Sequence, residues 1–498
     1  MDIDYLSLAP ELVLAGTVIS VLLADSFLDR TQKYWTAVLS VLGVTLAGLA
    51  VLVLAAGDPR TMLNGSWVVD DFALVLKGLF IGAGYLVLLM SVSYIESDRY
   101  YQGEYYFLLL TAILGASIMT SSRSLIILFI GLELVSAPAF MLAGWRKGDV
   151  RSNEAALKFF LTGILAAALM LYGMSFVYGL TGEVLFSGIS DAIFELELAG
   201  EPAMIMALLF IIAGFGFKIS AVPFHFWAPD TYEGAPTPVT AFLSVISKAA
   251  GFVGLLLVCY LAFPLLAGIW SWALGILAAV TMTVANLTAL RQRNIVRLLA
   301  YSSVAQAGFM LAPFAVAGAV GPGAAAIPGA LEATVTYLLI YLFMNLGAFA
   351  VVIAGARKTG TGTIAGWAGM YGYSSGLAAL AAVFFLSLAG IPPFAGWFAK
   401  FVMFQSVISG TDGWLVALAA VAAINAVVAL YYYARVVKVM FMDPVPATAP
   451  PEEIRVAPVA RSLVVALALS VGVILLAGVF PQVIAYFGDL TGTVVAGG

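Results

Sequence analysis

Long runs of apolar residues, joined by short polar connections, make up most of this chain of 498 residues. A helix needs about 20 mostly apolar residues to cross the hydrocarbon core of a bilayer, and the runs approach or exceed that length. They are continuous and lack the alternating pattern of barrel strands, which favours helices over a transmembrane β-barrel. We therefore expect an all-α polytopic membrane protein with about fourteen transmembrane helices. The predicted spans are 9–27, 34–56, 70–94, 105–121, 124–144, 153–179, 203–227, 237–262, 268–290, 295–319, 326–355, 374–407, 413–442 and 460–487.

The composition supports a membrane protein and excludes several classes of function. Hydrophobic residues make up 63% of the chain and charged residues only 10%, too few to cover the surface of a soluble protein of this length. There is no basic tract, so no nucleic-acid partner is expected. A single cysteine and a single histidine exclude an intrachain disulfide and argue against an iron–sulfur or Cys/His-rich metal site. No P-loop or dinucleotide fingerprint is present.

The distribution of Lys and Arg among the connections predicts the orientation of the chain. The even-numbered connections hold only Arg60 and Arg123, whereas the odd-numbered connections hold most of the other basic residues. Because basic connections stay on the cytoplasmic side of a membrane, both termini are expected on the non-cytoplasmic side.

Two pairs of similar segments recur at nearly the same offset, which predicts an internal repeat. ELVSAPAFML at 133–142 resembles SSVAQAGFML at 302–311, and AVPFHFW at 221–227 resembles IPPFAGW at 391–397. The alternative is chance, since Phe, Leu, Ala and Pro are abundant. A duplicated unit of five helices would place two inverted repeats in the membrane, each with a discontinuous helix. The predicted divisions are a three-helix segment 1–104, repeats 105–262 and 263–442, and a last helix within 443–498.

Five charged residues fall inside predicted spans and are the main candidates for function: Glu133, Lys158, Lys218, Lys248 and Lys400. An ionised group at the bilayer centre costs about 2.5–3.5 kcal/mol or more unless it finds a partner or water. One Glu–Lys pair could be a structural clamp, but five such residues favour function. Burial disfavours the charged form of a lysine and a nearby carboxylate restores it, so a set of this kind is suited to proton transfer.

Three further residues have two interpretations each. His225, just after Pro223, is either a proton carrier or a brace for the helix break, and both remain open. Glu332 is either a carboxylate in a half-channel or an ordinary interfacial residue. Lys77 is expected to extend its ammonium group outward to the membrane surface.

Several motifs identify the chain as similar to a known family, the antiporter-like membrane subunits of respiratory complex I and of sodium/proton antiporter complexes. The similar segments are PELVLAG at 10–16, the span with Glu133, KISAVPFHFWAPDTYEGAPTPVTAFLSVISKAAG at 218–251, YSSVAQAGFM at 301–310 and LAGIPPFAGWFAKF at 388–401. They cover nearly the whole chain. The wording of 218–251, including Lys248 where relatives often have histidine, resembles the complex I members more than the sodium/proton antiporter members, which remain the alternative.

The resemblance implies proton translocation coupled to quinone reduction elsewhere in a bacterial inner-membrane enzyme, NADH:quinone oxidoreductase. It implies that Glu133 pairs with Lys218, and that Lys158, Lys248 and Lys400 form the relay, with Lys400 nearest the outward exit. No cofactor is implied on this chain, because NADH, FMN, iron–sulfur clusters and quinone belong to partner subunits. The implied partners are sister antiporter-like subunits and small membrane subunits. Gln306 departs from the family pattern, where histidine is frequent, and water held by its amide would have to replace that group.

Overall fold

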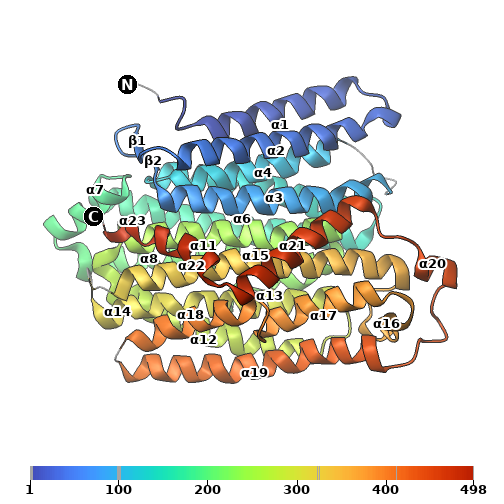
Figure 1. Ribbon diagram of the computed structural model, residues 1–498. Coiled ribbons are helices and arrows are strands. Elements are labelled where there is room, and N and C mark those ends of the chain that lie inside the picture. The colour runs from blue at the N-terminus through green and yellow to red at the C-terminus, as the bar shows by residue number, and fades with distance from the viewer. Residues whose placement is uncertain (1–3, 98–102, 322–323, 325, 411, 497–498) are drawn as a thin grey trace.

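Long helices that run side by side form almost all of the structure (Figure 1). This computed structural model describes residues 4–97, 103–321, 324, 326–410 and 412–496. The helices are stacked across the bundle from α1 and α2 at one side to α19 at the other (Figure 1). Both chain ends lie at one end of the bundle together with β1, β2 and α7, whereas α16 and α20 lie at the opposite end.

Within the described residues, thirteen helices are long and apolar enough to cross a membrane, which confirms the predicted all-α polytopic fold. They are α1 (Ala9–Phe27), α2 (Tyr34–Ala55), α3 (Asp71–Glu96), α4 (Glu104–Ser121), α5 (Leu125–Ala143), α6 (Val150–Thr181), α8 (Pro202–Ile219), the span Thr237–Ala262 with α10 (Thr237–Phe242) and α11 (Lys248–Leu257), the span Pro264–Ala289 with α12 (Ala267–Ala289), the span Ile295–Val320 with α13 (Ile295–Leu311) and α14 (Val316–Val320), α15 (Ala326–Thr359), α19 (Gly413–Met442) and α21 (Arg461–Val479). The remaining predicted span, 374–407, consists of two short helices, α17 (Ser375–Ala389) and α18 (Gly396–Ser409).

Short elements occupy the connections and the C-terminal region. Strands β1 (Arg60–Met62) and β2 (Trp67–Val69) form an antiparallel hairpin in which Met62 lies opposite Trp67. The short helices are α7 (Phe186–Glu195), α9 (Trp227–Gly234), α16 (Met370–Tyr373), α20 (Glu452–Val456), α22 (Gln482–Thr491) and α23 (Thr493–Ala496).

Polar caps mark the beginning of several spanning helices. The side chains of Asp70, Ser124, Asp149 and Asn294 each accept a hydrogen bond from a backbone N–H in the first turn of α3, α5, α6 and α13. Such caps satisfy N–H groups that have no partner within the helix. The chain therefore starts each of these helices at a defined residue in the connection.

The two predicted helix breaks are present and have the same kind of ending. Ser220 follows the end of α8 and Gly390 follows the end of α17, and both residues have the left-handed conformation, with φ of 61° and 90°. In both, the next N–H turns back to a carbonyl five residues earlier, at 2.8 Å for Ala221 and 3.0 Å for Ile391. This is the hydrogen-bond pattern of a Schellman ending. The matching ends support related halves, but the inverted repeat itself stays a prediction.

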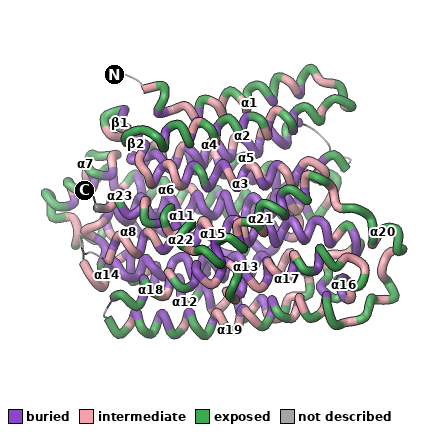
Figure 2. The backbone as a smooth tube through the Cα atoms, in the orientation of Figure 1, coloured by how far each residue is buried: buried purple, intermediate pink, exposed green. Residues whose placement is uncertain are grey.

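Burial separates a central layer of helices from an outer layer (Figure 2). The span Thr237–Ala262 is buried throughout, and α13 and α15 are mostly buried. By contrast, less than half of the residues in the apolar cores of α1, α2, α6, α19 and α21 are buried, as expected for helices that face lipid or partner subunits. α5 and α8, which carry Glu133 and Lys218, contact this buried central span.

Lys77 corrects one expectation, because its side chain points inward and is fully buried. Its Nζ lies 2.6 Å from Oε1 of Glu11 on α1, and Ser117 Oγ on α4 donates to the same oxygen at 2.6 Å. The ammonium group also lies 5.0 Å from the centroid of Trp67. The prediction of an outward lysine was wrong because α1 packs against this part of the bundle and supplies the opposite charge.

Replacing Lys77 by methionine should destabilise the N-terminal helices strongly. The substitution leaves the Glu11 carboxylate buried without its cation, and breaking a buried pair in this way costs about 3–5 kcal/mol. Thermal unfolding of the purified protein in detergent would measure the loss. The double variant Glu11→Gln/Lys77→Met should recover most of it, and a double variant as unstable as the single one would contradict the importance of charge pairing.

Candidate functional site

Lys218 lies in the last turn of α8, directly before the first helix break. Its ammonium group donates to Ser136 Oγ on α5 and lies 5.7 Å from the centroid of Phe140. The partial negative charge of a helix C-terminus favours a cation at this position. The break thus places the ammonium group of Lys218 beside a helix C-terminus, a hydroxyl group and an aromatic ring.

Glu133 lies one turn before Ser136 on α5 and interacts electrostatically with Lys218. The direct salt bridge implied by the resemblance is not formed between these two described residues, because the ammonium group is bonded to Ser136 instead. Oε1 of Glu133 is buried and has no hydrogen-bond partner among the described residues. The carboxylate is therefore near the lysine but not fixed to it.

Lys248 lies on α11, and a glycine on that helix permits a close approach to α8. A Cβ atom on Gly251 of α11 would lie 2.9 Å from Lys218 Cβ, so α8 and α11 are packed backbone to backbone there. Lys248 lies one turn before Gly251 and directly after a π-helical segment, Leu243–Ser247. Such segments are frequent at functional sites. Its Nζ donates to the carbonyl of Ser303 on α13 at 2.6 Å.

Polar side chains continue from Ser303 along α13. Tyr341 of α15 donates to Ser303 Oγ at 2.9 Å, and Tyr337, one turn earlier on α15, donates to Gln306 Oε1 at 2.5 Å. Gln306 Nε2 in turn donates to the carbonyl of Leu388 at 3.1 Å. The amide of Gln306 therefore bonds protein groups directly, rather than occupying an open polar pocket.

Lys400 completes this line of groups at the second helix break. Its Nζ donates to the carbonyl of Ala389 at 2.5 Å, next to the carbonyl that Gln306 uses, and lies 5.3 Å from the centroid of Phe309. A Cβ atom on Gly390 would lie 2.8 Å from Lys400 Cδ, so a glycine is needed where the lysine crosses the break. A series of polar groups, which we call the polar path, therefore extends from Lys248 to Lys400 along α13 and the end of α17, without one continuous chain of hydrogen bonds among the described residues.

The three central lysines share an unusual electrostatic environment. Lys218, Lys248 and Lys400 are 5%, 1% and 6% exposed, and none has a carboxylate within 4.0 Å among the described residues. Neutral oxygens hold all three ammonium groups. Because no fixed counter-ion locks the charged form and burial disfavours it, a lysine in such a site can exchange its proton.

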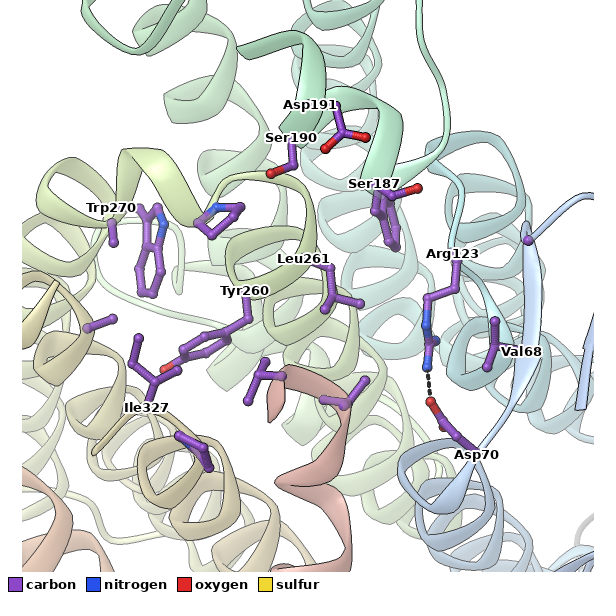
Figure 3. A pocket seen from close by; sticks show the side chains of 18 of the residues that line it. Val68, Asp70, Arg123, Ser187, Ser190, Asp191, Tyr260, Leu261, Trp270 and Ile327 are labelled. Carbon is purple, nitrogen blue, oxygen red and sulfur yellow. Dashed lines mark hydrogen bonds and ion pairs between the residues drawn. The ribbon is translucent and has the colours of Figure 1, made fainter. Parts of the chain in front are cut away.

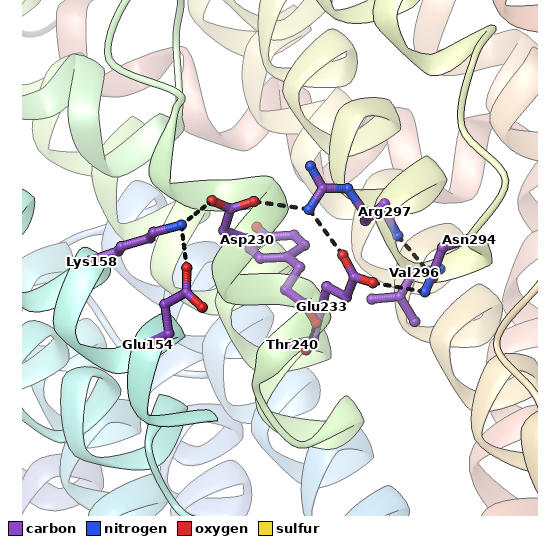
Figure 4. Close-up of polar contacts among 9 residues, drawn as sticks. Glu154, Lys158, Asp230, Glu233, Thr240, Asn294, Val296 and Arg297 are labelled. Carbon is purple, nitrogen blue, oxygen red and sulfur yellow. Dashed lines mark hydrogen bonds and ion pairs between the residues drawn. The ribbon is translucent and has the colours of Figure 1, made fainter. Parts of the chain in front are cut away.

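Lys158 corrects the expectation of a buried charge on α6. Its side chain is 45% exposed in this chain and pairs with Glu154 and Asp230, each at 2.7 Å (Figure 4). Asp230 on α9 also pairs with Arg297 of α13 at 2.8 Å. The sequence placed Lys158 within a long apolar run but did not reveal that it lies on the outer face of α6.

Asp230 was not among the predicted site residues, although it links α6, which carries Lys158, to α13. α9 lies outside the thirteen membrane-spanning helices. Burial raises the pKa of Asp230, but hydrogen bonds from Lys158 and Arg297 outweigh this effect and hold the pKa below its ordinary value. The carboxylate is therefore ionised at neutral pH and ties α6 to α13 (Figure 4). The only feature of the sequence that could have indicated Asp230 is its position as an acidic residue in the motif APDTYEGAP.

His225 lies in the segment between α8 and α9 and is 6% exposed. Its ring centroid is 4.6 Å from that of Phe226, and Nδ1 has no hydrogen-bond partner in the described part of the chain. This placement is compatible with a brace at the break and with a proton carrier. Both roles stay predictions.

A cavity of about 760 Å³ lies at the end of the bundle that holds the β-hairpin and α7 (Figure 3). Arg123 pairs there with Asp70 at 2.5 Å, and none of the six predicted site residues lines this cavity. Over the residues that the structure describes, no group of three or more His, Cys, Asp or Glu could hold a metal ion. The charged residues of the central helices, Glu133, Lys218, Lys248 and Lys400, are therefore a better candidate site than this cavity.

Comparisons with known proteins agree with the fold and with the motifs. The family model described as NADH:quinone oxidoreductase/Mrp antiporter, TM, matches residues 122–425. The chain is 40% identical to NADH-quinone oxidoreductase subunit N 2 of Streptomyces griseus, over 98% of this chain and 94% of that protein. A chain of respiratory complex I from Thermus thermophilus has a TM-score of 0.77 at 30% identity, with 96% and 98% of the two chains covered. A chain of the Mrp complex from Dietzia has a TM-score of 0.82 at 18% identity, over 99% and 98% of the two chains, which is a likeness of fold alone.

Proposed function

Because this chain belongs to the NADH:quinone oxidoreductase/Mrp antiporter family and is a proton-translocating membrane subunit of NADH:quinone oxidoreductase, we propose that its protons pass along the buried lysines. The proposed order is Glu133, Lys218, Lys248 and Lys400. The observation that carries this proposal is the polar path from Lys248 through Ser303 and Gln306 to the break beside Lys400. The path crosses the buried centre of the bundle rather than its surface.

Glu133 acts as the switch in this proposal. When its free carboxylate approaches Lys218, the charged form of the lysine is favoured, and the ammonium group leaves Ser136 Oγ. When Glu133 withdraws, the desolvated ammonium group loses its counter-ion and releases its proton toward Lys248. Movement of this one carboxylate therefore changes the proton affinity of Lys218, and each pKa unit of change corresponds to about 1.4 kcal/mol.

The tyrosines and Gln306 connect the last two lysines. A hydroxyl group both donates and accepts a hydrogen bond, so Tyr337 and Tyr341 can pass on a change in the direction of hydrogen bonding. Transfer from Lys248 then reaches Lys400, which releases the proton on the non-cytoplasmic side. Lys158, through Asp230 and Arg297, ties α6 to α13 beside this route, and His225 supplies a second titratable group at the first break.

The protein lies in a bacterial inner membrane with both termini on the non-cytoplasmic side, which the distribution of basic residues and the common position of the two termini support (Figure 1). Its partners are sister antiporter-like subunits and small membrane subunits, and NADH, FMN, iron–sulfur clusters and quinone are bound by other subunits. Residues 105–262 and 263–442 form the two inverted repeats, between the segment 1–104 and the final part 443–498.

A subunit of a sodium/proton antiporter is the alternative function. The likeness to the Mrp complex supports the fold alone, whereas the sequence identity to subunit N proteins extends over the whole chain. Copurification of this chain with NADH:quinone oxidoreductase activity would support the function in NADH:quinone oxidoreductase. Sodium resistance conferred without that activity would support the alternative.

Gln306→Leu should lower the number of protons pumped per NADH severalfold. Leucine has a similar size but removes both hydrogen bonds that join Tyr337 to the Leu388 carbonyl. Proton pumping and NADH oxidation are measured together in vesicles that contain the whole complex. Gln306→His is the matched control, because histidine keeps one donor and one acceptor and should retain most of the pumping. Full pumping by Gln306→Leu would contradict the proposed path.

A further inference from the structure

A small cavity of about 140 Å³ lies between the last turns of α15, the connection that follows α20 and the first turn of α21. It belongs to the end of the bundle that holds α20, opposite both chain ends, which is the cytoplasmic end in the proposed orientation (Figure 1). Two charged residues line it, Arg357 and Lys358, and both are cations. At about 30 Å³ per molecule the cavity would hold about five waters, which is enough space for a phosphate group.

Lys358 is a buried cation without a counter-ion. The residue is 7% exposed and forms no ion pair with a carboxylate of the described chain. Its Nζ donates to the carbonyls of Arg455 at 2.9 Å and of Ala457 at 2.6 Å. An ammonium group has three donors, so one N–H remains. Because a buried charge is costly without an opposite charge, an anion in this cavity would stabilise the protein.

Arg357 adds a second positive charge from the neighbouring position of α15. Its side chain extends to the end of α3, where Nη2 donates to the carbonyl of Ser93 at 2.8 Å and to Oγ of Ser97 at 3.0 Å. Both acceptors are neutral, so the charge is not compensated by them. A guanidinium group has five N–H donors, and the others remain for a further acceptor.

The first turn of α21 contributes the positive end of a helix to the same cavity. Ala460 and Leu463 line the cavity, and Ala460 at the N-cap provides no side-chain acceptor for the first N–H groups. Such N–H groups have no partner within the helix and carry partial positive charge, which favours phosphate. Arg461, the first residue of α21, is exposed and adds another cation beside the cavity. The side chains and the helix end therefore attract the same kind of ligand, an anion.

An exposed apolar strip begins next to the cavity and follows α21 into the membrane. Val464, Val465 and Leu469 are 48%, 46% and 44% exposed. Leu475 and Leu476 are exposed further along the helix, at the spacing that keeps them on the same side. A molecule with an anionic group at one end and long apolar chains at the other would contact both the cavity and the strip. A phospholipid has this structure, whereas a free phosphate ion would use the cavity alone.

The charge of the cavity favours anionic phospholipids over zwitterionic ones. Phosphatidylcholine and phosphatidylethanolamine carry a cationic group beside the phosphate, which Arg357, Lys358 and Arg461 would repel. Phosphatidylglycerol and cardiolipin carry negative charge only. The carboxylates of Glu452 and Glu453 on α20 are exposed and do not line the cavity. Basic pockets between spanning helices at the cytoplasmic surface are typical sites for anionic lipid headgroups.

We infer that this cavity binds the phosphate group of an anionic phospholipid, with Lys358, Arg357 and the first N–H groups of α21 as donors. The acyl chains lie along the exposed apolar strip of α21. The bound phosphate joins the end of α15 to the start of α21, and it fixes the connection between α20 and α21 at the membrane surface. This site goes beyond the proposed function, because none of its groups belongs to the relay.

Lipid binding is tested on the intact complex, reconstituted in phosphatidylcholine vesicles with a small amount of phosphatidylglycerol that carries a photoreactive group on an acyl chain. Peptide mass analysis after illumination should locate crosslinks within residues 461–476. Unlabelled phosphatidylglycerol should suppress them, whereas added phosphatidylcholine should not. Suppression by inorganic phosphate, but not by sodium chloride of equal ionic strength, would overturn the lipid and indicate a site for free phosphate. Absence of crosslinks in this segment would also overturn it and indicate that a partner subunit covers this face.

The basic residues are tested by the same crosslinking yield. Lys358→Gln and Arg357→Gln should each lower the yield about fivefold, the effect expected for loss of one cation near a lipid phosphate. Glutamine can still donate to the carbonyls of Arg455 and Ala457, so the connection keeps its hydrogen bonds. Lys438→Gln is the matched control, because it makes the same change at an exposed position near the end of α19 and should leave the yield unchanged. Equal yields for all three variants would overturn the site.

Discussion

Complexes that carry Lys218→Arg are expected to lose the proton pumping that depends on this chain, although arginine keeps the positive charge. Arginine has an ordinary pKa at least about two units above that of lysine, so in the same site its neutral form is about 100-fold rarer. The guanidinium group can still donate to Ser136 and interact with Glu133, so the electrostatic environment is preserved. What is lost is the ability to release the proton. The ratio of protons pumped to NADH oxidised in reconstituted vesicles measures this loss.

The control for Lys218→Arg is Lys147→Arg, which makes the same change at an exposed position in the connection before α6. Assembly is checked by copurification of the partner subunits, because Lys218 is packed closely against Gly251 and a larger side chain could disturb this contact. Lys218→Met, which is no larger than lysine, should give the same loss of pumping. Normal pumping by an assembled Lys218→Arg complex would contradict proton transfer through this residue.

Lys400→Met should also abolish transfer through this chain, by removing the last lysine of the path. Methionine is unbranched and similar in length, so it can follow the same course past Gly390 and the ring of Phe309. It cannot bind a proton, and it leaves the Ala389 carbonyl at the break without its donor. The expected decrease in pumped protons per NADH is about tenfold or more, as for removal of an essential proton-transfer group.

Phe401→Leu is the matched control for Lys400→Met, because Phe401 is the next residue of α18 and its side chain is exposed. It tests whether any substitution near the second break disturbs pumping. The two variants should differ clearly if the ammonium group is what matters. Equal pumping by both would mean that Lys400 serves only to close the end of α17.

The fold was largely predictable from the sequence because the membrane imposes a simple rule on apolar runs. Helix breaks were visible as Pro223 and as Pro392 and Pro393, and the structure has a left-handed helix ending before each. Long apolar runs with internal charges were recognisable for the same reason, since a charge in a hydrocarbon environment is costly. These signals depend on local sequence and on the bilayer, both of which can be read from a single chain.

The contacts of the charged groups were less predictable, because they depend on which helix faces which. Lys77 was misplaced because its partner Glu11 lies on a different helix. Lys158 was expected among buried charges but is half exposed and pairs with Asp230. Nothing in the sequence singles out Tyr337 and Tyr341, and only the packing of α15 against α13 places their hydroxyl groups on Gln306 and Ser303.

The most direct test of the proposed relay is the number of protons pumped per NADH oxidised for separate neutral substitutions at its four members. Glu133→Gln, Lys218→Met, Lys248→Met and Lys400→Met should each lower the ratio to the same reduced value, because a relay interrupted at any member is interrupted as a whole. Lys147→Gln, at an exposed position, should leave it unchanged. Normal ratios for all four relay variants in assembled complexes would contradict the relay and would leave the charges with a structural role.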